Sequence, residues 1–109
     1  MFTWDDFEKM DMRAGTIITA SIFEGLRKPA FKLSIDFGDL GIKKSSAQLT
    51  QLYTSDELIG KQIIAVVNFP PKQIANFFSE CLVVGIYNQQ HQVVLLKPDK
   101  EVSNGDKIG

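Results

Sequence analysis

The sequence has one cysteine, one histidine and no long hydrophobic run, and each shortage excludes a class of protein. Cys81 alone allows no disulfide within the chain, which favours a reducing compartment. Cys81 and His91 together are too few for a zinc site, so we expect no metal. No stretch approaches the roughly 18 apolar residues of a membrane span, and the N-terminus lacks a secretory signal. By elimination, we expect a cytoplasmic protein with no membrane insertion.

Residues that would carry catalysis are also scarce. Glu80 beside Cys81 has the wrong charge to activate a thiol. The acidic pairs Asp5–Asp6 and Asp56–Glu57 stand at predicted helix starts, where the helix dipole explains them. The glycines of 38–41 lie in a hairpin turn and not in a phosphate-binding loop. The sequence therefore predicts a binding protein and not an enzyme, with no catalytic residues and no cofactor.

The length of 109 residues and 44% hydrophobic content predict a single folded domain over residues 1–109. The formal net charge is −1, whereas proteins held to nucleic acid by bulk charge are usually basic. Acidic residues dominate positions 1–12 and basic residues positions 13–44. Any binding of nucleic acid must therefore use a local basic patch.

The first half of the chain predicts a short helix followed by three strands. Thr3 can cap a helix over Phe2–Lys9. Met12–Phe23 is rich in β-branched residues, and Gly15 within it suggests a bend or bulge. Phe31–Phe37 alternates apolar and polar residues, as in a half-buried antiparallel strand, and Ile42–Ala47 returns as the third strand.

The second half predicts a helical link and three further short strands. The link is the helical segment Leu49–Leu58, within which Ser55 can cap Asp56–Leu58. Ile63–Val67 is an apolar run buried on both faces, and a loop or short turn follows at 73–78. The last two strands, Leu82–Tyr87 and Val93–Leu96, are joined by the hairpin loop 88–92, and a polar tail follows from Pro98.

This order predicts an all-β fold: the OB-fold, a five-stranded Greek-key barrel that binds oligonucleotides and similar ligands. We expect it to carry an extra hairpin strand, a short N-terminal helix and a helical link between strands 3 and 4.

Three groups of residues are candidates for a binding site. The basic group is a solvated surface or a groove for phosphate and acidic peptide groups; it consists of Arg27, Lys28, Lys32, Lys43, Lys44 and Lys72. The aromatic group plugs the barrel ends or is an exposed interaction site; it consists of Phe69, Pro70, Pro71, Phe77 and Phe78. The polar run Ser45–Thr50 caps the following helix, which we favour, or binds a ligand backbone.

Seven motifs follow one another along the chain in a recognisable order: Arg13–Ile17, Arg27–Ala30, Ile35–Gly38, Ser45–Gln48, Ala65–Lys72, Ser79–Glu80 and Pro98–Asp99. In this order they resemble the CsaA secretion chaperones, members of the wider tRNA-binding-domain family. The resemblance covers nearly the whole chain, and the Asn-Phe-Pro-Pro and Ser-Ser-Ala-Gln segments together make it specific. The chain has Ser79-Glu80-Cys81-Leu82 where tRNA-binding relatives carry Ser-Glu-Gly-Met at the RNA site.

The resemblance implies an OB-fold homodimer that binds unfolded or preprotein segments and assists export without ATP. The peptide would meet Phe69, Pro70, Pro71, Phe77 and Phe78, with Arg27 and Lys28 at the rim. Phe2, Trp4 and Phe7 on the N-terminal helix would seal the dimer. The alternative is a structure-specific tRNA-binding protein that uses the basic face, with RNA-binding residues Lys32, Lys43, Lys44, Lys72, Ser79 and Glu80.

Overall fold

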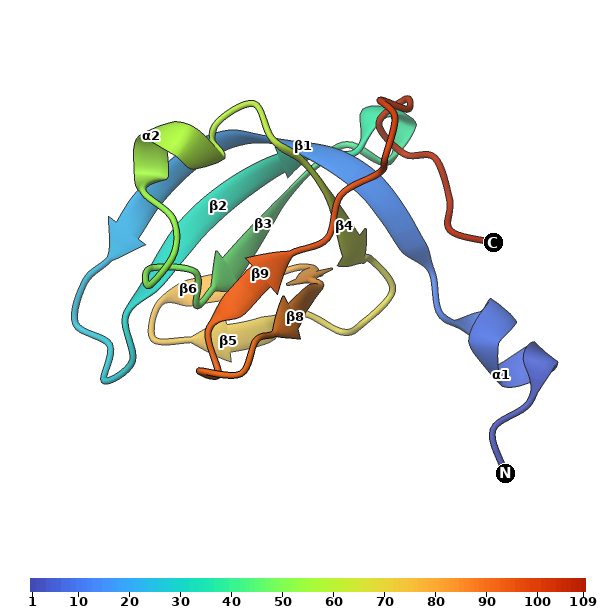
Figure 1. Cartoon of the computed structure of the whole chain (residues 1–109), viewed down its shortest axis with the longest axis horizontal. Helices are drawn as coiled ribbons and strands as arrows, with labels where there is room; N and C mark the ends of the chain where they lie inside the picture. Colours follow the sequence, from blue (N-terminus) through green and yellow to red (C-terminus); the bar gives the residue numbers. More distant parts are fainter.

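The computed structural model describes all residues from Met1 to Gly109 and consists mainly of short strands (Figure 1). Its helices are α1 (Trp4–Lys9), the 3-10 turn η1 (Gly38–Leu40) and α2 (Ser55–Leu58). Its strands are β1 (Met12–Phe23), β2 (Ala30–Asp36), β3 (Ile42–Ala47), β4 (Gln62–Val66), β5 (Lys72–Ile74), β6 (Phe77–Ser79), β7 (Leu82–Val83), β8 (Gly85–Tyr87) and β9 (Val93–Leu95). No helix is long and apolar enough to cross a membrane.

A five-stranded antiparallel sheet, in the order β3-β2-β1-β4-β7, curls into the body of the molecule (Figure 1). Two separate hairpins, β5–β6 and β8–β9, complete the strands. The predicted OB-type fold is confirmed, including the short N-terminal helix and the helical link between β3 and β4. The additional strand forms part of the β8–β9 hairpin.

Strand β1 lies at the centre of the sheet and bends strongly as it crosses from β4 to β2 (Figure 1). Its register against β2 shifts between Ile17 and Thr19, so the predicted bulge exists but lies beyond Gly15. Gly15 has another role: a Cβ there would lie 2.6 Å from the Phe37 ring. Only glycine lets the strand pass this close to the core.

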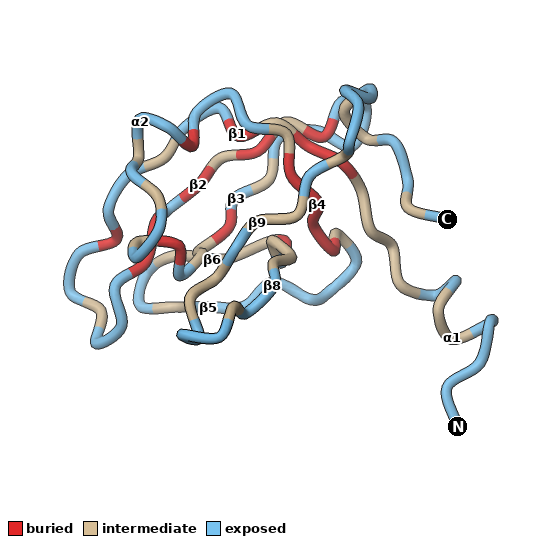
Figure 2. Tube along the Cα trace, in the orientation of Figure 1, coloured by how far each residue is buried: buried red, intermediate tan, exposed pale blue.

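The core lies on the concave face of the curled sheet (Figure 2). The alternating apolar residues of 31–37 are all buried, as predicted, and the side chains of Ile35 and Phe37 are fully enclosed. Four of the five residues of β4 are buried, which confirms burial of this strand on both faces. Leu58 of α2 covers the core and has no exposed surface. Burial at about 25 cal/mol per Å² makes this cluster the main source of stability.

Hydrogen bonds between β3 and residues 79–81, at the end of β6 and just after it, close the barrel. Glu80 N donates to Lys44 O at 2.7 Å, and Lys44 N donates to the Glu80 carboxylate at 2.9 Å. Ser46 N donates to Ser79 Oγ at 3.1 Å. The fully buried Ser45 hydroxyl donates to Cys81 O at 2.9 Å. Side-chain hydrogen bonds therefore join β3 to residues 79–81, which form no regular strand ladder with it.

The helical link differs from its prediction. Residues 49–54 do not form a helix, and α2 contains only four residues. Its cap is Thr54, whose hydroxyl accepts from Glu57 N, and the Glu57 carboxylate accepts from Thr54 N. The predictions of Ser55 as the cap and of 45–50 as a capping run are therefore wrong. A complete capping box at Thr54 offers two reciprocal bonds, which a cap at Ser55 lacks.

The strands after β4 also differ. The segment predicted as a loop at 73–78 is the β5–β6 hairpin, which turns at Ala75 with a positive φ of 53°. The predicted strand 82–87 is divided at Val84, which donates to Ile64 O but accepts from Leu96 N. The chain thus changes partners at Val84, from β4 to β9.

The N-terminal helix projects away from the barrel (Figures 1 and 2). Its predicted cap is confirmed: the Thr3 hydroxyl accepts from Asp6 N at 3.2 Å, and the Asp6 carboxylate accepts from Thr3 N at 3.0 Å. No residue of α1 is buried. The C-terminal tail, by contrast, folds back on β1, where Ala14 N donates to Asp106 O and Gly105 N donates to Ala14 O.

Candidate functional site

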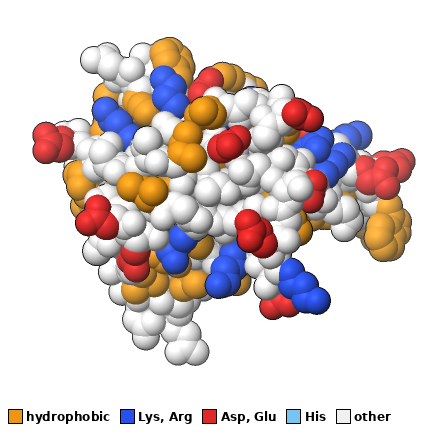
Figure 3. Space-filling view, turned by 90° about the horizontal axis from the view of Figure 1, so that it is seen from above, with side chains coloured by type: hydrophobic (Ala, Val, Ile, Leu, Met, Phe, Trp, Pro, Cys, Tyr) orange, Lys and Arg blue, Asp and Glu red, His pale blue; other side chains and the backbone are white.

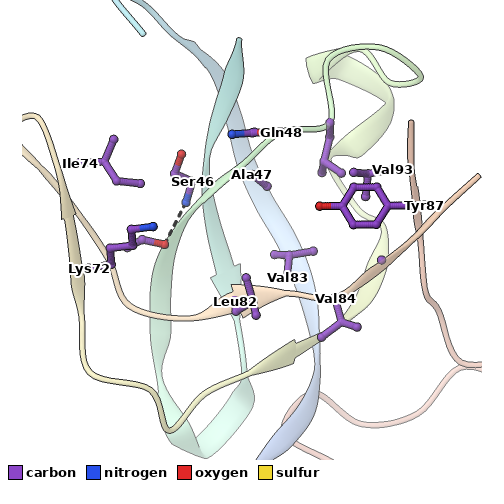
Figure 4. A pocket seen from close by; sticks show the side chains of 13 residues that line it. Ser46, Ala47, Gln48, Lys72, Ile74, Leu82, Val83, Val84, Tyr87 and Val93 are labelled. Carbon is purple, nitrogen blue, oxygen red and sulfur yellow. Dashed lines mark hydrogen bonds between the residues drawn. The ribbon is translucent and has the colours of Figure 1, made fainter. Parts of the chain in front are cut away.

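A groove of about 550 Å³ lies between the two hairpins and the end of β3 (Figure 4). We call it the hairpin groove. Its lining residues are Ser46, Ala47, Gln48, Leu49, Lys72, Ile74, Ser79, Leu82, Val83, Val84, Gly85, Tyr87 and Val93. Because they come from β3, both hairpins and the β7–β8 junction, no single sequence motif identifies this groove.

The groove has an apolar floor and exposed apolar edges. Ala47, Val83 and Val93 are half-buried and pack against the core. Leu82 and Tyr87 are exposed, by 51% and 73% respectively. Large apolar side chains that border a hollow gain by burial when another molecule covers them.

The opposite wall is polar and carries a single charge. Ser46, Gln48 and Lys72 line this side, where Ser46 N donates to Ser79 Oγ (Figure 4). Gln48 is exposed, and no hydrogen bond within the protein uses its side chain. Lys72, the only charged lining residue, forms no ion pair. The wall can thus offer amide, hydroxyl and ammonium groups to a ligand.

A second cluster, the lysine–phenylalanine face, consists of Phe23, Lys32, Lys44 and Phe77. The Lys32 ammonium lies 4.6 Å from the centre of the Phe23 ring and 5.6 Å from that of Phe77. Lys44 lies 5.6 Å from the Phe77 ring centre, and the two rings meet edge to face at 5.4 Å. Neither lysine has an acidic partner, so both charges remain available to an anionic ligand.

The predicted RNA-binding residues divide into four groups. Lys32 and Lys44 lie together on the lysine–phenylalanine face, and Lys72 lies in the hairpin groove. Lys43 neighbours Lys44 on β3 and so projects from the other face of the strand. Ser79 and Glu80 use their side chains to hold β3, which gives this pair a structural reason to be present.

The predicted peptide-binding residues do not line the hairpin groove. Phe69 and Phe78 are exposed by 46% and 50%, and the prolines between β4 and β5 are exposed as well. Phe77 is half-buried against Phe23. Arg27 and Lys28 are exposed in the β1–β2 loop and form no ion pair. Phe77 is thus partly packed, as expected of a residue that plugs the barrel, whereas Phe69 and Phe78 are uncovered, as expected of an interaction site.

Sequence reasoning missed most of the hairpin groove, although it singled out the Ser45–Thr50 run as able to bind a ligand backbone. Ser46 and Gln48 of that run do line the groove. Ile74 carried no signal because the β5–β6 hairpin was not recognised, and Leu82 and Tyr87 were assigned to one predicted strand with no binding role.

Cys81 directly precedes the groove residue Leu82 but belongs to the buried core and is unsuited to thiolate chemistry. It is buried, and this burial raises the pKa of its thiol to about 11. The reactive thiolate is therefore nearly absent at neutral pH.

The predicted dimer residues form an apolar hollow of about 580 Å³ on α1, lined by Met1, Phe2, Thr3, Trp4 and Phe7. Trp4 is 88% exposed and Phe2 69%. Seen from above, a hydrophobic group projects at the right, where α1 lies, while other hydrophobic side chains are scattered among charges (Figure 3). The apolar residues of α1 thus share one hollow, and further exposed apolar side chains lie elsewhere on the barrel.

Comparison with known proteins decides the family. A family model described as "Putative tRNA binding domain" matches residues 12–107. The chain belongs to the tRNA-binding-domain family. The structure is similar to that of the chaperone CsaA from Bacillus anthracis, with 51% identity, a TM-score of 0.95 and coverage of 100% of this chain and 99% of the other. For the CsaA chaperone protein from Picrophilus torridus the identity is 56% and the TM-score 0.94, with both chains covered completely. The resemblance to CsaA proteins is therefore confirmed over the whole chain.

A curated relative of different size is the methionine–tRNA ligase of Methanococcoides burtonii. It is 32% identical over 108 residues, which is 99% of this chain but 16% of the ligase. The chain thus spans about a sixth of the ligase and corresponds to one part of that longer protein.

Proposed function

We propose that this protein is a homodimeric chaperone that binds unfolded or preprotein segments in the cytoplasm and assists their export, without ATP and without catalysis. The observation that carries the proposal is the hairpin groove, with its apolar floor and a polar hydrogen-bonding wall whose one charge is Lys72. Similarity to two CsaA chaperones over the whole chain supports it.

The groove suits an unfolded chain better than a folded surface or a small polar metabolite. Leu82 and Tyr87 offer exposed apolar area to client side chains at about 25 cal/mol per Å². Gln48 and Ser46 border the same space with polar groups that suit a peptide backbone. Apolar burial combined with main-chain hydrogen bonding selects for unfolded polypeptide and not for one sequence.

The uncovered apolar side of α1 supports the homodimer. A helix of six residues is not stable alone in water, and α1 buries none of its residues in the barrel. A symmetric pairing of two copies would cover Phe2, Trp4 and Phe7. We expect Trp4→Ala to weaken the dimer at least tenfold in sedimentation analysis, whereas Ile22→Ala, at an exposed position on β1, leaves it unchanged.

The binding test uses a permanently unfolded, fluorescently labelled polypeptide and anisotropy. Leu82→Asp places a charge at the groove edge and is expected to weaken binding at least tenfold. The matched control is Ile42→Asp, because Ile42 is 62% exposed on β3 but lies outside the groove. The proposal is contradicted if both variants lose the same binding affinity, or if neither variant loses any.

Binding of tRNA is the second candidate, favoured by the family and by the two unpaired lysines of the lysine–phenylalanine face. Phosphate contacts release counterions, so tRNA binding would weaken steeply with salt. Replacing Lys32 and Lys44 by Gln is expected to lower the salt slope by about two, one for each phosphate contact. The control replaces Lys97 and Lys100, which lie outside this face. An unchanged slope excludes this face as the tRNA site.

A further inference from the structure

Strand β8 has one paired edge and one free edge. Asn88 N donates to Gln92 O, and Leu96 N donates to Val84 O. Antiparallel bonds alternate along a ladder, so between these two pairs Ile86 bonds to Val94. The N–H and C=O groups of Gly85 and Tyr87 therefore point away from β9, and no other hydrogen bond within the protein engages them.

This free edge borders the hairpin groove. Gly85 and Tyr87, the two residues whose backbone groups are unbonded, both line it. The edge is free because Val84 leaves β4 and joins β9, so that no strand follows β8 on its other side. Gly85 and Tyr87 stand two positions apart in β8, so their backbone groups point to the same side. Together they present two N–H donors and two C=O acceptors to the hairpin groove, which is the pattern of a sheet edge that can pair with a further strand.

We propose that a client segment binds as an added β-strand on β8, with its main chain bonded to Gly85 and Tyr87. This inference rests on the function proposed above and specifies its mode of recognition. Alternate side chains of the added strand would face the apolar floor at Val83 and Val93, while the others face solvent. Main-chain bonds are common to all sequences, which suits a protein that binds many unfolded clients.

The charge of the groove selects an acidic residue in the bound segment. Lys72 is the only charged lining residue and has no acidic partner. A second copy of this chain would not supply one, because residues 82–92 contain no Asp or Glu. Charge complementarity therefore favours an extended apolar client segment with an acidic side chain over pairing of two β8 edges.

The test uses short fluorescent peptides of alternating valine and serine with one central aspartate. One version carries N-methyl groups on the amides of one parity and another version on those of the other parity. Strand addition uses only one parity, so we expect one version to bind about tenfold more weakly than the unmodified peptide and the other within about twofold. Equal binding of all three peptides contradicts strand addition. If none of them binds while a long unfolded polypeptide does, this inference fails and the proposed function stands; if neither binds, both fail.

Substitutions at Tyr87 and Lys72 test the protein side. Tyr87→Pro removes the outward N–H at an edge position that tolerates proline, whereas Tyr87→Ala removes only the side chain. We expect the proline variant to bind the peptide about tenfold more weakly than the alanine variant. Equal affinities, or a changed oligomeric state in Tyr87→Pro alone, overturn the inference. We further expect Lys72→Gln to weaken binding of the aspartate peptide but not of its asparagine counterpart; equal effects on the two peptides exclude the acidic selection.

Discussion

The curled sheet and the two hairpins use similar residues in opposite ways. In β4, four of five residues are buried, whereas β8 buries none of its three (Figure 2). The sheet has neighbours along β1, β2 and β4, whereas each hairpin pairs only with itself. This difference indicates that stability and binding reside in separate segments, so a substitution should affect one property without the other.

The largest effect is expected in the sheet core. Phe37→Ala removes a fully buried ring and should cost about 3 to 5 kcal/mol of unfolding free energy, measured by denaturant titration. The matched change in a hairpin is Phe78→Ala, where the ring is half-exposed and the cost should remain below about 1.5 kcal/mol. Similar losses of unfolding free energy at Phe37 and Phe78 would show that the sheet and the hairpins do not differ in their contribution to stability.

The next effect depends on pH. Burial raises the pKa of the Cys81 thiol from 9.0 to about 11. Between these values the folded thiol keeps its proton while the unfolded one loses it, so this contribution is complete below pH 9 and is lost as pH rises to 11. A two-unit shift corresponds to about 2 to 3 kcal/mol. As pH rises from 9 to 11, the difference in unfolding free energy between the native protein and Cys81→Ala should narrow by this amount. A difference that stays constant over this range contradicts the prediction.

A smaller effect is expected where the barrel closes. Ser45→Ala removes the buried hydroxyl that donates to Cys81 O, at a cost of about 1 kcal/mol in unfolding free energy. The loss is limited because Ser79 Oγ also donates to this carbonyl, at 3.2 Å. The double change of Ser45 and Ser79 should therefore cost more than the sum of the single changes. Strict additivity would show that the two hydroxyls do not share this role.

The smallest effect on stability is expected in the β8–β9 hairpin. Tyr87 is 73% exposed, so Tyr87→Ala should change the unfolding free energy by less than about 0.5 kcal/mol. Binding of unfolded polypeptide should nevertheless weaken several-fold, because the ring borders the hairpin groove. If Tyr87→Ala lowered the unfolding free energy by as much as it lowered the binding free energy, stability and binding would not reside in separate segments.

The sheet was predictable because its strands are long and regular. Met12–Phe23 and Ile42–Ala47 were placed at their observed bounds, since β-branched content and turn glycines define them locally. Alternation in 31–37 also identified the buried face correctly. The capping error arose because Thr54 and Ser55 are adjacent, and only the reciprocal bond with Glu57 distinguishes them.

The hairpins and the groove were much less predictable. Strands β5 and β6 have three residues each, too short for a period to emerge, and their turn contains Ala75 at a positive φ where glycine or asparagine is usual. The groove depends on side chains as far apart in sequence as Ser46 and Val93, which only the fold brings together. Of the lysines predicted on one basic face, Lys32 and Lys44 do lie together, because strand pairing is a local consequence of the hairpin, whereas Lys43 projects from the other face of β3.

Mapping backbone amide chemical shifts during titration with an unfolded polypeptide tests the central claim most directly. The account predicts shifts concentrated at Ser46, Gln48, Gly85 and Tyr87, which surround the hairpin groove. Shifts confined to the lysine–phenylalanine face, or none along the groove, would contradict it.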